Sequence, residues 1–189
     1  MTGDLKSGAK EPWHLLQLAA YVIGRPDPCI QFEEEGHRYS TADRDLVSVT
    51  KLVSKKNDFY APGSAHRGHM VHRMCTLDAQ GVLDDATVDP ALLGYLTAWR
   101  KYRREMRPKF LALEQVVGDI QLGFAGRRDL DVEGPDDKAF VLYLRKTGTY
   151  GMEWLAGPQL GEKMAEVKKL CREYHEGKRL SMFEEAPCQ

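Results

Sequence analysis

Apolar residues recur at helical spacing in four segments of this 189-residue chain. The first segment begins at Pro12, which suits a first helical turn, and ends near Gly24, so we expect a buried amphipathic helix there. The same spacing predicts helices over residues 64–79 and 90–106. A charged amphipathic helix is expected over residues 158–178, followed by a loose tail.

Shorter apolar runs predict the strands. A hairpin with an acidic turn is expected over residues 30–40, and Ser48 opens a short helix that leads toward Lys55 and Lys56. Another strand is predicted over residues 140–144. Helices that bracket a hairpin-built sheet indicate an α/β or α+β fold, and the length of the chain suits one domain, residues 1–189.

A second hairpin is predicted between residues 111 and 132. Its turn is expected at Gly118 and Asp119, and its second strand contains Gly123 and Gly126. Glycine inside a strand indicates a bulge or a close approach of the backbone to another group. The second strand of this hairpin is therefore a place where something else comes near the sheet.

The composition is that of an ordinary soluble globular protein, with 42% hydrophobic residues, 29% charged residues and a formal net charge of −1. No apolar run approaches the ~20 residues of a membrane span. Acidic and polar residues interrupt the first segment before a signal-peptide core could form. We therefore expect a cytoplasmic protein with no membrane partner.

The cysteines are scattered and show no C-x-x-C spacing, so neither a zinc site nor a disulfide framework is indicated. They are Cys29, Cys75, Cys171 and Cys188. An iron–sulfur cluster would need closely spaced cysteines, and none is expected.

Residues 99–110 carry six basic residues against the single acid Glu105, with aromatic residues between them. Two interpretations stay open. Such a patch can lie along a phosphate backbone, or it can be the solvated face of a basic helix. The first interpretation makes DNA-binding residues of Arg100, Lys101, Arg103 and Arg104.

Asp4 and Lys6 lie two residues apart, and on a strand their side chains would point to the same face. A protein typically holds Mg²⁺ through one or two carboxylates. The ion activates a water molecule, and a nearby ammonium group can offset the developing negative charge. Two or three convergent acids and one lysine are thus the minimal set for a metal-dependent phosphodiesterase. Asp4, Lys6, Glu114 and Asp129 supply this set if the fold brings them together.

Several stretches along the chain carry a resemblance to known proteins. They are Asp4-Leu5-Lys6-Ser7-Gly8, Gln17-Leu18-Ala19-Ala20-Tyr21, Gly36-His37-Arg38-Tyr39, Ser48-Val49-Thr50, Arg67-Gly68-His69-Met70-Val71-His72, Leu113-Glu114 and Gly123-Phe124-Ala125-Gly126-Arg127-Arg128-Asp129. Together they resemble the PD-(D/E)XK nuclease superfamily, most closely its RecB-like and phage exonuclease branch. The resemblance implies a restriction-endonuclease-like fold, a mixed β-sheet flanked by helices.

The resemblance also implies roles for individual residues. Asp129 would be the central metal-binding aspartate, Glu114 would belong to the first acidic motif, and His72 would be a further metal ligand. Asp4 and Lys6 would form the D-x-K pair, so that Asp4 also binds the metal. The cofactor implied is Mg²⁺ or Mn²⁺.

The supporting residues follow from the same resemblance. Gln17 and Tyr21 match the Q-x-x-x-Y motif, which supports the site and contacts DNA. Arg67, on the predicted helix 64–79, joins the residues expected to bind DNA.

The order of the motifs departs from the family. The D-x-K strand and the Q-x-x-x-Y helix, within residues 1–24, precede the central aspartate instead of following it. At their usual place the chain has Leu144-Arg145-Lys146-Thr147-Gly148, where leucine replaces the required acid. The simplest account is a permuted strand order in which the N-terminal segment docks at its usual place in the sheet. A swapped arrangement, in which one subunit of a homo-oligomer lends this segment to another, is the alternative.

The leading function is a Mg²⁺- or Mn²⁺-dependent DNA nuclease, expected to be an exonuclease in recombination, repair or phage replication, with DNA and a recombination or replication protein as partners. The first alternative is an inactive nuclease-fold protein that binds nucleic acid or a protein partner. A structural phage or accessory protein is a weaker third. The first two differ in whether the Asp4 carboxylate comes within about 5 Å of that of Asp129, close enough to share a metal ion.

Overall fold

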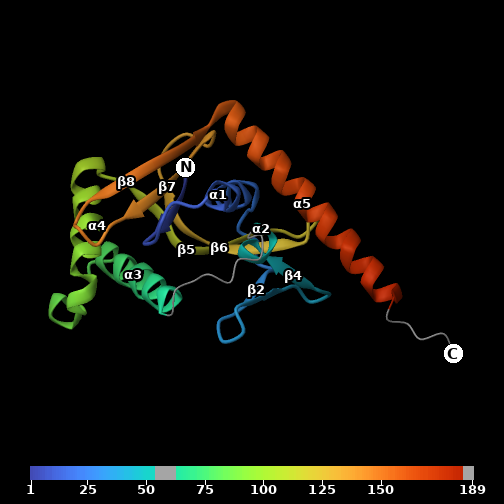
Figure 1. Ribbon diagram of the computed structural model, residues 1–189, viewed down its shortest axis with the longest axis horizontal. Coiled ribbons are helices and arrows are strands. Elements are labelled where there is room, and N and C mark those ends of the chain that lie inside the picture. The colour runs from blue at the N-terminus through green and yellow to red at the C-terminus, as the bar shows by residue number, and fades with distance from the viewer. Residues whose placement is uncertain (54–62, 185–189) are drawn as a thin grey trace.

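The chain folds as a mixed α/β structure in which five α-helices flank an eight-stranded sheet, within the residues 1–53 and 63–184 that this computed structural model describes (Figure 1). The strands are β1 (Thr2–Lys6), β2 (Gln31–Glu33), β3 (Arg38–Ser40), β4 (Asp45–Ser48), β5 (Phe110–Asp119), β6 (Phe124–Val132), β7 (Lys138–Leu144) and β8 (Tyr150–Ala156). The helices are α1 (Trp13–Ile23), α2 (Val49–Val53), α3 (Ser64–Ala79), α4 (Leu93–Met106) and α5 (Gly157–Glu184).

The first strand of the chain lies inside the sheet. The strand order is β2-β3-β4-β6-β1-β7-β8, and β5 pairs with the other side of β6. β1 runs antiparallel to β6, with Gly3 opposite Leu130, and parallel to β7, with Leu5 opposite Leu142. The expectation that the opening strand docks beside the late hairpin is therefore confirmed within one chain.

β7 shows why the sheet is buried on both faces. Its run of apolar residues alternates between two cores, as expected for a strand covered by helices on either side. Ala139, Val141 and Tyr143 belong to one core, and Phe140, Leu142 and Leu144 belong to the other. All six are buried.

The two cores correspond to two helical layers. The first core joins α1, α2 and α5 to the sheet through residues such as Leu18, Val49 and Val167. The second core joins α3 and α4 to the opposite face, through residues such as Val71 and Trp99. Leu5, at 2% exposure, belongs to this second core. None of the helices in the described segments has the length and apolarity needed to cross a membrane.

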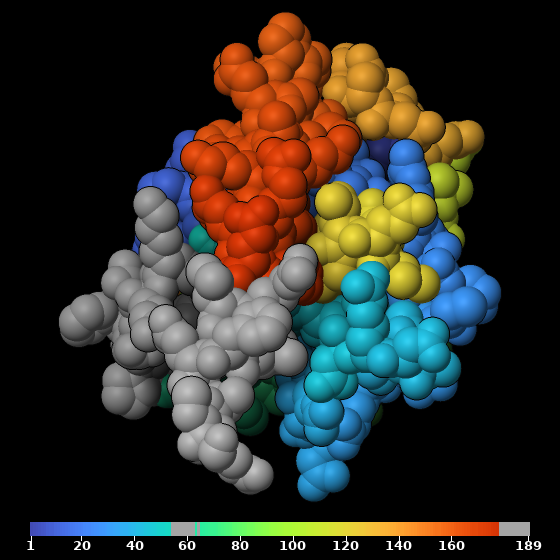
Figure 2. Space-filling view, turned by 90° about the vertical axis from the view of Figure 1, so that its right-hand side faces the viewer, coloured from blue at the N-terminus to red at the C-terminus, as the bar shows by residue number. Residues whose placement is uncertain are grey.

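The β2–β3 hairpin and β4 form a smaller lobe that projects from the body of the molecule (Figure 1). Its own small core contains Ile30, Tyr39 and Leu46, which pack on Ala125 of β6. Seen from the side, the β5–β6 turn lies between this lobe and α5 (Figure 2). His175 of α5 contacts the backbone oxygen of Leu122 in that turn at 3.1 Å.

Most predicted helices and strands are confirmed. The segments 12–24 and 64–79 form α1 and α3, whereas residues 90–92 form a 3-10 turn that precedes α4. The helix after Ser48 is α2, and its expected continuation lies outside the described residues. α5 extends beyond the expected end at residue 178, and the expected tail, residues 185–189, also lies outside the described part. β4 and β8 were not predicted.

The predicted turn of the second hairpin is wrong. Gly118 and Asp119 continue β5, and the turn comprises residues 120–123 instead. Gly118 pairs with β6 and also bridges to Arg25, and a Cβ atom at this position would lie 2.6 Å from the backbone oxygen of Phe124. The glycine therefore permits a close approach between backbones rather than a change of chain direction.

Replacing Leu5 by alanine tests whether β1 is a core strand. Because Leu5 is buried between helices and sheet, the loss of its side chain should lower the free energy of unfolding by about 2–5 kcal/mol in urea denaturation. Leu111→Ala, at a position 65% exposed on β5, serves as the control and should change it by less than about 0.5 kcal/mol. Equal effects of the two substitutions would show that β1 does not hold the sheet together.

Candidate metal centre

The site lies where two strands approach the same edge of β6. β4 pairs with Phe124 and Ala125, while β1 pairs with Leu130 and Asp131. In the described chain no strand pairs with residues 126–129 on that edge, so the backbone there borders a gap in the sheet. Gly126 keeps this gap narrow, since a Cβ atom there would lie 2.7 Å from the Tyr21 ring. The predicted close approach at Gly126 is thus confirmed.

Asp129 is at the centre of the cluster. Its Oδ2 accepts the backbone N–H of Leu5 at 2.7 Å, and its Oδ1 lies 3.2 Å from Nδ1 of His72 on α3. Burial acts to raise the pKa of Asp129, but the charge of His72 and its hydrogen bond outweigh burial and hold the pKa below its ordinary value. Asp129 is therefore ionised at neutral pH.

Asp4 lies next to Asp129 and is 1% exposed. Its Oδ1 accepts a hydrogen bond from Nζ of Lys6 at 3.0 Å. Burial acts to raise the pKa of Asp4, Lys6 opposes the rise and the charge of Asp129 adds to it, and the pKa that results is about 8. Because the two carboxyl groups influence each other, they titrate as a pair, with Asp129 losing its proton first.

His72 joins the two strands of the hairpin to α3. Its Nδ1 lies 3.2 Å from Asp129 and 3.7 Å from Oε1 of Glu114. Burial acts to lower the pKa of His72, but the charge of Asp129 and the hydrogen bonds to both carboxylates outweigh it and raise the pKa to about 10. The imidazolium of His72 therefore offsets the negative charge of Asp129 and Glu114. It must lose its proton before it can bind a metal.

Glu114 reaches this cluster through an unusual backbone conformation. Leu113 pairs with Leu130 and Gln115 with Arg128, so Glu114 lies opposite Asp129. The φ angle of Glu114 is +52°, which is uncommon for a non-glycine residue inside a strand. Oε2 of Glu114 forms an ion pair with Nε of Arg127 at 2.8 Å. Strained residues of this kind concentrate at functional sites.

The donor set suits a divalent cation. One ligand atom each from His72, Glu114 and Asp129 lie within 4.8 Å of one another. Two further oxygens, Oδ2 of Asp4 and Oε1 of Gln17, are buried without a hydrogen-bond partner among the described residues. Both residues line the same cavity of about 150 Å³. Oxygen donors with one imidazole are the ligands expected for Mn²⁺, and the carboxylates alone suit Mg²⁺.

Gln17 and Tyr21 close the cavity from the side of α1. Nε2 of Gln17 donates to the Tyr21 hydroxyl at 2.8 Å. Tyr21 is 4% exposed, and burial raises its pKa well above the ordinary value, with the charges of Asp4 and Asp129 adding to the rise. The pair thus supports the acidic cluster as a neutral, hydrogen-bonded wall.

Seven of the residues predicted from the sequence line this one cavity: Asp4, Lys6, Gln17, Tyr21, His72, Glu114 and Asp129. His37, Tyr39, Ser48, Thr50 and Arg127 also line it, although the sequence analysis assigned them no role. They all fall in stretches that carry the family resemblance, which is the signal that could have identified them.

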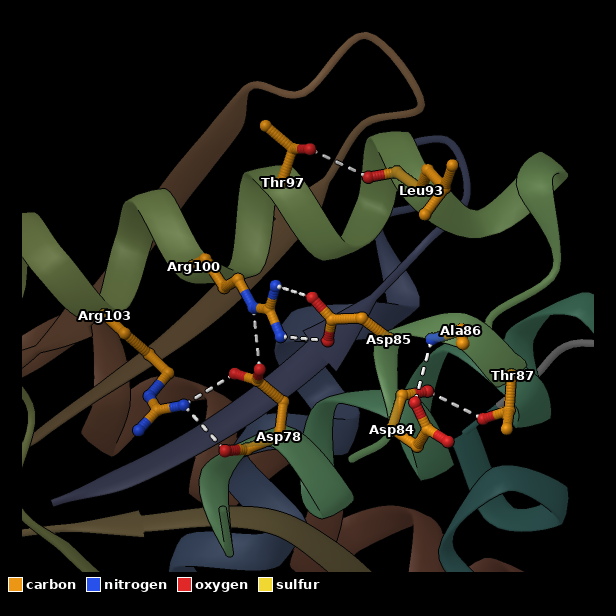
Figure 3. Close-up of polar contacts among 9 residues, drawn as sticks. All are labelled: Asp78, Asp84, Asp85, Ala86, Thr87, Leu93, Thr97, Arg100 and Arg103. Atoms are coloured by element: carbon orange, nitrogen blue, oxygen red, sulfur yellow. Dashed lines mark hydrogen bonds and ion pairs between the residues drawn. The ribbon is translucent and has the colours of Figure 1, made fainter. Parts of the chain in front are cut away.

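The other predicted DNA-binding residues lie elsewhere. Arg67 is exposed on α3 and is not part of the cavity lining. On α4, Arg100 binds Asp78 and Asp85 at 2.7 Å and 2.6 Å, and Arg103 binds Asp78 at 2.6 Å (Figure 3). These carboxylates offset much of the positive charge that the sequence places on this helix.

The remaining basic residues of this helix have weaker acidic partners among the described residues. Lys101 lies 3.9 Å from Glu105, a weak exposed pair. Arg104 lines a separate hollow of about 440 Å³, together with Arg107 and the ion-paired arginines. The face is therefore basic only in part.

No protein-family model matches the chain, and a search of curated proteins finds no match either. The assignment of the site consequently depends on the geometry and chemistry of its residues.

His14 on α1 lies behind the cluster and is 4% exposed. Its Nδ1 accepts the backbone N–H of Glu11 at 3.2 Å and lies 3.3 Å from the Tyr143 hydroxyl. Burial lowers the pKa of His14 to about 3, and the charge of Lys6 adds to the effect. His14 is therefore neutral in the folded protein.

This buried neutral histidine predicts an acid sensitivity. Because the unfolded chain binds a proton below about pH 6.5 and the folded chain does not, stability should fall from pH 6.5 toward pH 3. The expected loss from His14 is about 2 kcal/mol at pH 5. His72 acts in the opposite sense: its raised pKa favours folding below pH 6.5, and that contribution is lost as the pH rises through about 10.

The measurement is urea denaturation of the wild type and His14→Gln at pH 7 and pH 5. The variant should lose about 2 kcal/mol less than the wild type between these two pH values. An identical decrease in both proteins would contradict a neutral, buried His14.

Proposed function

We propose that this protein is a metal-dependent DNA nuclease of the PD-(D/E)XK type, with a permuted strand order on a restriction-endonuclease-like fold. The observation that carries the proposal is the convergence of Asp4 and Lys6 with Glu114 and Asp129, which are more than 100 positions away in the chain. Nothing in local sequence requires this convergence. It supplies the acids and the ammonium group that phosphodiester hydrolysis needs.

The energetic cost of the cluster supports a functional role. It contains the amide oxygen of Gln17, buried without a hydrogen-bond partner among the described residues, and Glu114 in a left-handed conformation. Each feature costs on the order of 1–3 kcal/mol. A fold that needed only stability would be served better by apolar residues at these positions. Features that cost stability without a packing benefit indicate a binding or catalytic site.

Asp129, Glu114, His72 and Asp4 are the residues that would hold the ion. When bound, a divalent cation polarises the scissile phosphate and lowers the pKa of a coordinated water molecule. Lys6 holds its ammonium group beside Asp4, where it can orient the attacking water and offset negative charge on the phosphate. Tyr21 and Gln17 keep the opposite wall of the cavity neutral, so that an anionic substrate is not repelled there.

Loss of the central acid or the ammonium group should abolish cleavage. Asp129→Asn and Lys6→Ala are each expected to reduce Mg²⁺-dependent degradation of linear DNA by at least about 100-fold. Asp136→Asn and Lys138→Ala, at exposed positions outside the cavity, are the matched controls and should leave the rate unchanged. Robust DNA binding without turnover in the wild type would instead favour a non-catalytic nucleic-acid-binding protein.

Metal binding should also appear as a gain in stability. At a Mn²⁺ concentration about 100 times the dissociation constant, the free energy of unfolding should rise by about 2.7 kcal/mol, and EDTA should reverse the gain. Thermal and urea unfolding with and without Mn²⁺ measure this. The same gain in Asp129→Asn would place the ion somewhere other than the proposed centre.

A further inference from the structure

Three aromatic rings gather on the β2–β3 hairpin, at the mouth of the candidate metal centre. Phe32 stacks on Tyr39 with ring centroids 4.8 Å apart. The imidazole of His37 meets both rings edge-on, at 5.3 Å from Phe32 and 5.6 Å from Tyr39. His37 and Tyr39 line the same cavity as the acidic cluster.

His37 lies at the end of the hairpin turn, beside the Phe32–Tyr39 pair. Phe32 and Tyr39 are directly paired across the two strands, and Tyr39 is buried. His37 is exposed and ends a four-residue turn with a φ angle of +47°, a left-handed conformation that histidine adopts more often than most residues. Its backbone N–H donates to the carbonyl oxygen of Glu34 at 3.2 Å, so the turn fixes the backbone from which the ring reaches the cavity lining. An exposed ring on the lining of a cavity is accessible to a ligand bound there.

Arg127 connects this hairpin to the metal centre. Its guanidinium group lies over the Phe32 ring, 5.5 Å from the centroid, while its Nε binds Glu114 at 2.8 Å. The flat groups of His37 and Arg127 therefore both contact Phe32 and both line the cavity, and Arg127 itself binds a candidate metal ligand. Imidazole and guanidinium planes are surfaces on which nucleic-acid-binding proteins stack unpaired bases.

We propose that the hairpin binds an unpaired nucleobase next to the phosphate that is cut, with His37 as the stacking surface. The proposal rests on the proposed function and names its substrate class: single-stranded or frayed DNA. The turn of the hairpin supports this choice, because Glu33, Glu34 and Glu35 are all exposed there. Three like charges repel the phosphates of a second strand, whereas a flipped or unpaired base carries no charge.

The test is equilibrium binding of a fluorescein-labelled twelve-residue oligothymidylate in the presence of EDTA, followed by fluorescence anisotropy. His37→Asn removes the ring and keeps a residue that tolerates the left-handed conformation. We expect it to weaken binding about 5- to 100-fold, and we expect His37→Tyr, which restores a ring, to recover most of the loss. An oligonucleotide of the same length with abasic sites should bind the wild type and His37→Asn equally.

Unchanged binding by His37→Asn, or an equal loss on the abasic oligonucleotide, would overturn the proposal. A parallel cleavage assay in Mg²⁺ separates this result from the proposed function. If the wild type cleaves DNA and His37→Asn binds normally, the stacking role fails while the nuclease assignment stands. If binding depends on the ring but no cleavage occurs in Mg²⁺, the nuclease assignment fails while the base-binding role stands.

A second variant tests the charge of the turn. Glu34→Gln combined with Glu35→Gln should raise the relative affinity for a blunt duplex over the single strand, because it removes the repulsion of a second backbone. The ratio of the two dissociation constants, measured in EDTA at low salt, is the readout. An unchanged ratio would overturn the part of the proposal that assigns single-strand selectivity to the turn.

Discussion

One hydrogen bond joins the two halves of the candidate site, from the backbone N–H of Leu5 to Oδ2 of Asp129. It exists because β1 lies between β6 and β7, with its apolar side chains in one core and its charged side chains in the cavity. β1 pairs with β6 at Thr2 and Gly3 and with β7 along its whole length, so Asp4 and Lys6 are held from the β7 side while their other side borders the cavity. The chemistry proposed for the site depends on this placement.

The cluster illustrates how a fold can support groups that do not stabilise it. Asp4, Asp129 and His72 are charged or coupled groups within a protein interior, and each alone would be costly to bury. Their mutual contacts and those to Lys6 and Glu114 reduce this cost, while the two apolar cores provide the stability that the site lacks. The same division applies to the β2–β3 hairpin, where the Phe32–Tyr39 pair holds the strands and leaves His37 exposed.

The sequence predicted the helices and most strands well, because their hydrophobic spacing is regular. It also predicted seven of the residues that line the cavity, through the stretches that carry the family resemblance. The hairpin turn was misplaced because Gly118 is selected by a close backbone approach that only the fold reveals. Glu114 adopts a left-handed conformation inside a strand, with partners on β6 and α3, and local patterns do not encode it. The partners of Arg100 on α4 were not predicted, since Asp78 and Asp85 come from other elements.

The most direct measurement is the position of Mn²⁺ in crystals of the full chain, located by its anomalous scattering. The account predicts one strong peak within about 2.2 Å of carboxylate oxygens of Asp129 and Glu114, with Asp4 or His72 completing the protein ligands. A peak that avoids Asp129, or the absence of any peak in this cavity at saturating Mn²⁺, would contradict the claim that the opening strand and the late hairpin together form a metal centre.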